Sequence, residues 1–88
     1  MSTKIIDDTM TPAQCRAARA LLGITQSQLA HASRLGLSTV VDFEKGRRIV
    51  SEEAVKAIQT ALQRAGIEFM DENDVGQGLL LRKRQKRT

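Results

Sequence analysis

Apolar residues recur at intervals of three to four through the first two thirds of the chain, in stretches that each begin with a capping residue. Thr11-Pro12-Ala13-Gln14 combines a capping threonine, a proline at the first helical position and a glutamine three residues after the cap, which together make a capping box. This start, and the left-handed stop offered by Gly23, predict a helix that ends at about Leu22. Its apolar stripe consists of Cys15, Ala18 and Leu22.

A second capping box predicts a short helix directly afterwards. Thr25-Gln26-Ser27-Gln28 repeats the same pattern of threonine followed after three residues by glutamine. The residues that this helix buries are predicted to be Leu29, Ala30 and Ser33.

Two more helices complete the helical part of the chain. The first covers about residues 37–45 and is closed by Gly46. Its inward-facing residues are Val40 and Phe43. The other begins after the capping residue Ser51, has two glutamates at the positive end of its dipole, and ends at Gly66. Its core stripe is Val55, Ile58, Leu62 and Ala65.

After Gly66 the apolar pattern changes to that of a β-hairpin. Two short apolar runs, IEFM and LLL, flank the turn-rich segment DENDVGQG, which predicts a hairpin with a loop of about eight residues. Ile67 and Phe69 share one face, with Leu79 and Leu81 opposite them. Because an isolated hairpin is marginal in water, this one is expected to pack on the helices, pair with a second molecule, or do both.

These elements predict one small, mainly α domain, a bundle of about four helices with a C-terminal β-hairpin. Residues 1–10 form an N-terminal arm, 11–66 the helical domain, 67–82 the hairpin and 83–88 a basic, disordered tail. A chain of 88 residues has no room for a second independent core.

The net charge of +4 is unevenly distributed. Residues 16–50 sum to +4 and residues 51–81 to −4, and the tail is again basic. A basic central segment suggests nucleic acid as a partner, although a merely solvated basic surface explains the charge on its own equally well. Only Phe43 and Phe69 are aromatic, so the base-stacking platforms of single-strand and RNA binders are missing and a reader of duplex DNA is favoured.

The composition also excludes several classes of function. One cysteine and one histidine, Cys15 and His31, cannot form an internal disulfide or one of the usual zinc sites within one chain. The motifs assemble no nucleophile–base pair, so we expect neither an enzyme nor a cofactor. No run of 18 uncharged apolar residues and no secretory signal is present, so no membrane contact and a cytoplasmic location are expected.

The stretch RAARALLGITQSQLA, followed by TVVDFEKGRR, closely resembles the Cro and phage-repressor (xenobiotic-response-element type) helix-turn-helix family. The segment AIQTALQRAGIEF resembles the small single-domain bacterial members of that family. The matching positions are Arg19, Gly23, Gln26, Leu29, Ala30, Thr39, Val40, Glu44 and Gly46. The resemblance covers about residues 12–82 and implies a lambda-repressor-like helix-turn-helix fold that binds double-stranded DNA.

Three positions depart from the family pattern. The turn glycine falls on Arg34, which must adopt a left-handed conformation at some cost or change the turn. The cap of the recognition helix falls on Gly36, and the proline expected later in the chain is Val50. A register shifted by two residues, with Ser38 as the cap, leaves too few residues before Glu44 for the third helix, so the unshifted register is preferred.

The resemblance implies specific roles for the residues of the helix-turn-helix. Arg19 and Glu44 form a structural ion pair. The base-reading residues are Leu37, Ser38, Val41 and Asp42, where apolar side chains can contact a thymine methyl and Asp42 can accept from cytosine. For Val41 and Asp42 there is an alternative, in which Val41 packs at the helix edge and Asp42 pairs with Arg47 or caps the helix. The residues expected at the DNA backbone are Thr25, Gln26, Arg47 and Arg48, the two arginines reaching a phosphate or a base edge.

The sequence therefore predicts a bacterial or phage-like transcriptional regulator, most simply a repressor that binds a two-fold operator as a homodimer. Its expected dimer interface is the hairpin, through Ile67, Phe69, Leu79, Leu80 and Leu81. Two alternatives share the fold: an antitoxin whose C-terminal part neutralises a partner toxin, and an accessory subunit that binds another protein or regulator.

Overall fold

The computed structural model describes residues 10–47, 50–69 and 79–81, apart from the side chain of Leu80. Over these residues the elements are, in order, α1 (Pro12–Leu22), α2 (Gln26–Ser33), α3 (Leu37–Lys45), α4 (Glu52–Arg64), β1 (Ile67–Phe69) and β2 (Leu79–Leu81). The prediction of a mainly α bundle with a C-terminal hairpin is therefore confirmed. Nearly all of the predicted arm, the hairpin loop and the basic tail lie outside the described residues.

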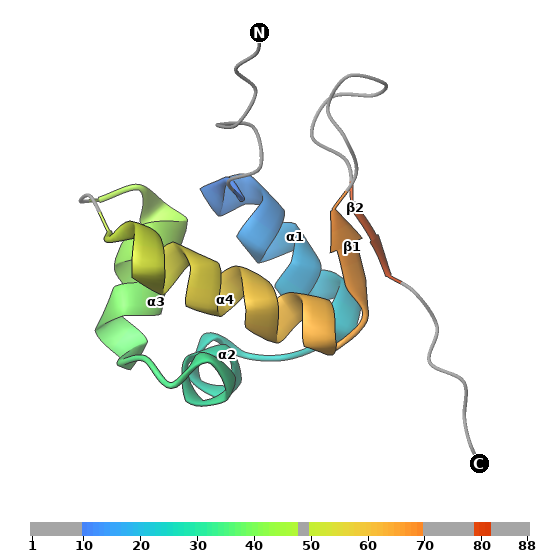
Figure 1. The fold of residues 1–88 in the computed structure, drawn as a ribbon, viewed down its shortest axis with the longest axis horizontal. Coiled ribbons are helices and arrows are strands. Elements are labelled where there is room, and N and C mark those ends of the chain that lie inside the picture. The colour runs from blue at the N-terminus through green and yellow to red at the C-terminus, as the bar shows by residue number, and fades with distance from the viewer. Residues whose placement is uncertain (1–9, 48–49, 70–78, 82–88) are drawn as a thin grey trace, which may run out of the picture.

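The four helices enclose one core, and the hairpin packs at the end of the bundle away from α3 (Figure 1). In that view α4 crosses the front, α3 lies at the left, α2 lies below and the two strands stand at the right. The apolar residues that form the core are Met10, Cys15, Ala18, Leu29, Ala30, Val40, Phe43, Val55, Ile58, Leu62 and Ile67. Every helix contributes to this core, so the relative placement of α2 and α3 depends on packing against α1 and α4.

Local capping signals account for the boundaries of α1 and α2. The Thr11 hydroxyl accepts from the Gln14 amide at 3.1 Å, and the Gln14 side chain accepts from the Thr11 amide at 2.9 Å. Thr25 and Gln28 repeat this reciprocal pair at 3.0 and 2.9 Å. Because each capping box satisfies two amides that have no partner inside the helix, both predicted starts occur where the sequence placed them.

The end of α4 differs from the prediction. The helix stops at Arg64, with Ala65 as its C-cap, one residue before Gly66. Ala65 is exposed and does not belong to the core stripe, because the chain leaves the helix before that residue can turn inward. Ala61 packs against the core one turn earlier. The predicted stripe is confirmed only for its first three residues.

The turn between α2 and α3 has a left-handed residue at the position where the family pattern has a glycine, although the residue in this chain is Arg34. Arg34 has φ 60° and ψ 40°, and it is the only non-glycine residue with positive φ in the described part of the chain. Its amide donates to the carbonyl of His31 at 3.1 Å, and the next amide donates to Ala30 at 2.9 Å. Of the two outcomes expected for Arg34, the structure therefore shows the left-handed residue rather than an altered turn.

Replacing Arg34 with glycine is expected to raise the free energy of unfolding by about 0.5–1 kcal/mol. The left-handed conformation costs a residue with a Cβ about 1–2 kcal/mol, and the greater freedom of glycine in the unfolded chain cancels about 0.4–1 kcal/mol of that gain. Urea unfolding monitored by circular dichroism measures the difference. Arg34→Ala is the matched control, because alanine removes the exposed guanidinium and keeps the strain; a rise of the same size in both variants would contradict the backbone explanation.

The start of α3 decides between the two registers. Gly36 is the N-cap, with φ −73° and no side-chain capping bond, and the helix begins at Leu37. Ser38 lies inside the helix, so the register with Ser38 as the cap is wrong.

The hairpin packs on the helices, which is one of the two arrangements expected for it. Its antiparallel register pairs Ile67 with Leu81 and Phe69 with Leu79. Ile67 is only 3% exposed, and Phe69 and Leu79 pack against the core. Leu81 is 37% exposed, so part of the apolar surface of the hairpin stays open to solvent.

Candidate nucleic-acid interface

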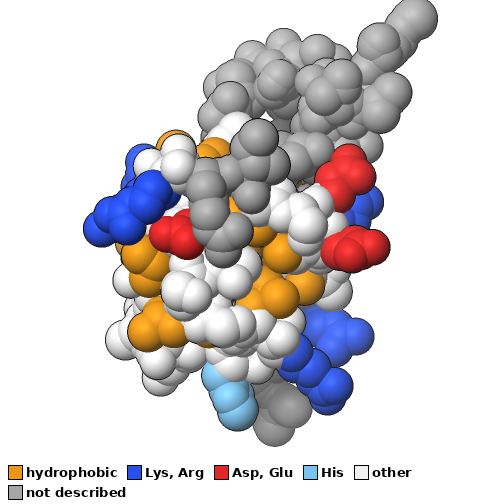
Figure 2. Space-filling model, turned by 90° about the vertical axis from the view of Figure 1, so that its left-hand side faces the viewer, with side chains coloured by type: hydrophobic (Ala, Val, Ile, Leu, Met, Phe, Trp, Pro, Cys, Tyr) orange, Lys and Arg blue, Asp and Glu red, His pale blue; other side chains and the backbone are white. Residues whose placement is uncertain are grey.

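The outward surface of α3 is uncharged over most of its length. Leu37 is 48% exposed, Ser38 is exposed and Val41 is half-buried. Figure 2 views the molecule from the side where α3 lies, and shows hydrophobic side chains and uncharged white atoms at the centre of this face, with Lys and Arg side chains, and also Asp and Glu side chains, toward both sides. The uncharged outer face of α3 suits the floor of a major groove, where a helix meets base edges rather than phosphates.

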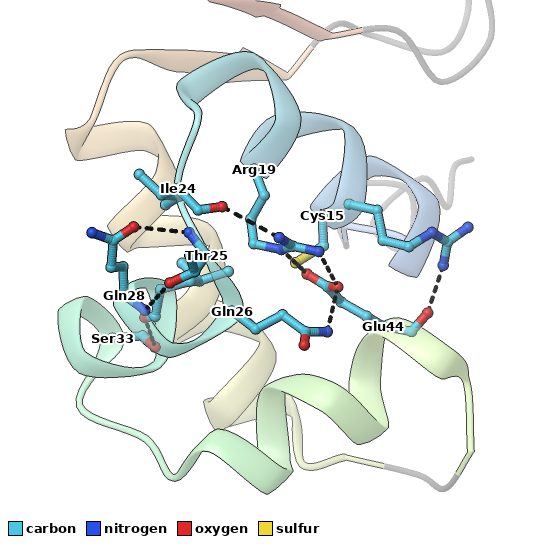
Figure 3. Close-up of polar contacts among 10 residues, drawn as sticks. Cys15, Arg19, Ile24, Thr25, Gln26, Gln28, Ser33 and Glu44 are labelled. Atoms are coloured by element: carbon cyan, nitrogen blue, oxygen red, sulfur yellow. Dashed lines mark hydrogen bonds and ion pairs between the residues drawn. The ribbon is translucent and has the colours of Figure 1, made fainter.

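The carboxylate of Glu44 holds the three N-terminal helices together. Figure 3 shows the side chains of Arg19 from α1 and Gln26 from α2 converging on it. Arg19 donates from Nε to Oε2 at 2.8 Å and from Nη2 to Oε1 at 2.9 Å, a bidentate ion pair. The Gln26 Nε2 group donates to Oε1 at 3.0 Å, and the Cys15 thiol donates to Oε2 at 3.2 Å. A buried carboxylate with this many donors has its desolvation largely compensated.

Two backbone carbonyls extend the cluster around Glu44. Arg19 also donates to the Ile24 carbonyl at 3.3 Å, just before α2 begins. Arg16, one turn earlier on α1, donates to the carbonyl of Glu44 itself at 2.5 Å. The end of α3 is therefore held by α1 through both its side chain and its main chain.

The pKa shifts in this cluster follow from burial and hydrogen bonding. Burial alone would raise the pKa of the Glu44 carboxyl, but the donors from Arg19, Gln26 and Cys15 outweigh burial and hold the pKa below its ordinary value of 4.5. Burial, followed by the hydrogen bond to Glu44, raises the pKa of the Cys15 thiol far above its usual range. Cys15 is therefore a protonated donor at neutral pH and not a nucleophile.

Two members of this cluster differ from what the sequence predicts. The sequence predicts only packing for Cys15 and only a phosphate contact for Gln26. A signal for the first was present, because Cys15 and Arg19 are four residues apart and therefore lie on the same face of a helix. No spacing rule connects Gln26 to Glu44, which is 18 residues away and on another helix.

A second ion pair lies at the end of α3. Arg47 Nη1 is 3.8 Å from Asp42 Oδ1, and the Arg47 side chain is 60% exposed. The structure thus brings Asp42 and Arg47 together, as in the alternative considered for Asp42. The hydroxyl of Thr25 accepts from the Gln28 amide within the cap of α2, and Arg48 lies outside the described residues.

Comparison with known proteins agrees with this geometry. A family model described as Helix-turn-helix matches residues 16–69, more than half of the chain, and it is the Cro and phage-repressor type anticipated from the sequence. No curated protein matches the chain. Within the described ranges, no helix is long and apolar enough to cross a membrane. The chain belongs to the Cro and phage-repressor helix-turn-helix family of DNA-binding transcriptional regulators.

Proposed function

We propose that this protein is a repressor that recognises a two-fold operator in double-stranded DNA as a homodimer and acts in the cytoplasm, where bacterial DNA lies. The observation that supports this most strongly is the Glu44 cluster. It joins α1, α2 and α3 through buried, charge-assisted bonds and leaves the outer face of α3 exposed. A reading helix must be held rigidly if small differences between base pairs are to become differences in affinity.

The base-reading contacts are assigned to the exposed face of α3. Leu37 and Val41 offer apolar contacts to thymine methyl groups, and Ser38 can contact a donor or an acceptor. Asp42 is an acceptor that can contact cytosine N4 directly or act through the arginine with which it pairs.

The backbone contacts are assigned to the start of α2 and to the segment after α3. Thr25 and Gln26 lie at the N-terminus of α2, a place in a helix that favours a phosphate. The Gln26 side chain uses one N–H on Glu44 and has a second for DNA. Arg48 follows α3 and supplies a phosphate contact, and Arg47 beside it reaches a phosphate or a base edge.

The dimer contact is assigned to the hairpin and the adjoining groove. This shallow groove is lined by Ala13, Gln14, Ala17, Ala20, Leu21 and Leu79, mostly apolar residues. Leu21, one of these residues, is 47% exposed, and Leu81, two residues beyond Leu79 on β2, is 37% exposed. Ile67 and Phe69 support the hairpin from the core side, while Leu79, Leu80 and Leu81 are proposed to meet the second protomer.

The experiment that tests this function is selection of bound fragments from a genomic library, followed by binding measurements on the selected DNA over a range of salt concentrations. A repressor of this kind prefers one sequence with approximate two-fold symmetry.

Arg48→Ala is expected to weaken binding to operator and random DNA alike, and to reduce the log–log salt slope by about 0.9. Arg64→Ala, at the far end of α4, is the matched control and leaves both quantities unchanged. Equal binding to all sequences, together with a protein that co-purifies, would favour the antitoxin or accessory-subunit alternative.

A further inference from the structure

The exposed face of α3 lacks a side chain suited to recognising guanine. The four residues proposed to read bases are Leu37, Ser38, Val41 and Asp42, and none of them presents the paired donors that recognise guanine O6 and N7. Lys45 is exposed at the end of the helix, but its ammonium is a point charge rather than a fork. A helix with these residues reads thymine methyl groups and cytosine well and guanine poorly.

Arg47 is positioned to supply the paired donors that α3 lacks. Gly46 has φ 64°, and this left-handed residue turns the chain back over the end of α3. The Arg47 amide then donates to the Asp42 carbonyl at 3.0 Å, so the backbone of Arg47 is fixed against the helix one turn from its end. Arg47 Nη1 approaches the carboxylate of the same residue at 3.8 Å. Main chain and side chain therefore both direct Arg47 toward Asp42.

The pairing with Asp42 favours a base over a phosphate. A guanidinium beside a carboxylate is partly neutralised, which weakens its attraction to the DNA backbone, and the carboxylate itself is repelled by phosphates. Arginine has five N–H donors, so one contact with Asp42 leaves others for an acceptor pair on a base edge. An exposed ion pair at this distance adds little to stability, so the effect that we assign to it is orientation of the Arg47 guanidinium.

We propose that Arg47 is a specificity-determining residue that reads a guanine in each half-site, and that Asp42 is the residue that positions it. The proposal rests on the proposed function, since it requires that the protein recognises a DNA sequence. It assigns to Arg47 a base edge rather than a phosphate, and to Asp42 a role through Arg47 rather than a separate cytosine contact.

The test measures the affinity of wild type and variants for the selected operator and for every single-base substitution of one half-site. Arg47→Ala is expected to abolish the preference for guanine at one position, a loss of discrimination of about 5- to 150-fold, and to leave preferences elsewhere unchanged. Arg47→Lys keeps the charge but lacks the fork, so it is expected not to restore that preference. Asp42→Asn is expected to weaken discrimination at the same position. Arg64→Ala is the control for loss of a surface charge.

Replacing the guanine with 7-deazaguanine removes the N7 acceptor and gives an independent measurement. It is expected to weaken binding of the wild type and to have no effect on binding by Arg47→Ala.

The proposal is overturned if Arg47→Ala lowers affinity for all sequences equally with a shallower salt slope, or if Arg47→Lys binds as wild type, because either result identifies a phosphate contact. It is also overturned if Asp42→Asn alters a different base pair. Sequence preference without dependence on Arg47 refutes this inference alone, whereas a wild type without any sequence preference refutes the proposed function as well.

Discussion

Replacing Arg19 with alanine is expected to lower the free energy of unfolding by about 3–5 kcal/mol, the usual cost of stranding one partner of a buried ion pair. The partner here is Glu44, whose side chain is 2% exposed and makes a bidentate contact with Arg19 at 2.8 and 2.9 Å. Without the guanidinium, only Gln26 and Cys15 still donate to the carboxylate. Urea unfolding of the two proteins at neutral pH measures the loss.

The pH dependence of this loss distinguishes a stranded charge from lost packing. In the wild type the pKa of Glu44 is depressed, so its contribution to stability is present above the unfolded value of about 4.5 and disappears as the pH falls through the folded value. In Arg19→Ala the burial of Glu44 is expected to dominate and to raise the pKa of its carboxyl in the folded protein. The destabilisation is therefore greatest at neutral pH and decreases as the pH falls below the pKa of Glu44 in the unfolded chain. The gap between the two proteins should therefore narrow below about pH 4.5. A gap that is the same at pH 7 and at pH 3.5 would show that the aliphatic stem of Arg19, rather than its charge, stabilises the fold.

The parts of the fold that follow from the sequence are those governed by local chemistry. Capping threonines, a glutamine three residues later and a terminal glycine determine where α1 begins and ends, because the amides and carbonyls at helix ends need partners within a few residues. Arg34 shows the limit of this reasoning. The sequence leaves two outcomes for it, and packing of α2 and α3 against the rest of the bundle decides in favour of the left-handed residue.

The features that could not be derived locally are contacts between distant segments. The family resemblance suggests that Arg19 faces Glu44, but the additional donors from Cys15 and Gln26 depend on how closely three helices approach. The same is true of the hairpin. Alternation predicts which residues share a face, whereas the burial of Ile67 and the exposure of Leu81 depend on where the strands meet α1 and α4.

Replacing Leu81 with lysine is expected to convert the proposed homodimer into a folded monomer and to reduce operator affinity by a factor of about 100 or more. Leu81 is 37% exposed on β2, which has one unpaired edge in the described two-stranded sheet. An exposed apolar strand edge either aggregates or pairs, and a lysine there prevents both. The two half-sites of an operator are about 34 Å apart, so linking two protomers makes the second binding event intramolecular, which raises affinity by about 10²–10⁴.

The position of the hairpin supports this arrangement. Figure 1 shows α3 and the hairpin at opposite ends of the bundle, so two protomers that meet through their hairpins hold their α3 helices apart, as separate half-sites require.

Light scattering is the decisive measurement, with a molar mass of twice 9.7 kDa expected for the wild type and 9.7 kDa for Leu81→Lys. Thr60→Lys, which adds the same charge on the exposed side of α4, is the matched control and should remain a dimer with its operator affinity intact. Weak binding to random DNA should survive in both variants, because each protomer keeps its own phosphate contacts. A wild type that is a monomer at tens of micromolar and that occupies its operator one molecule at a time would show that the hairpin serves the monomer fold alone.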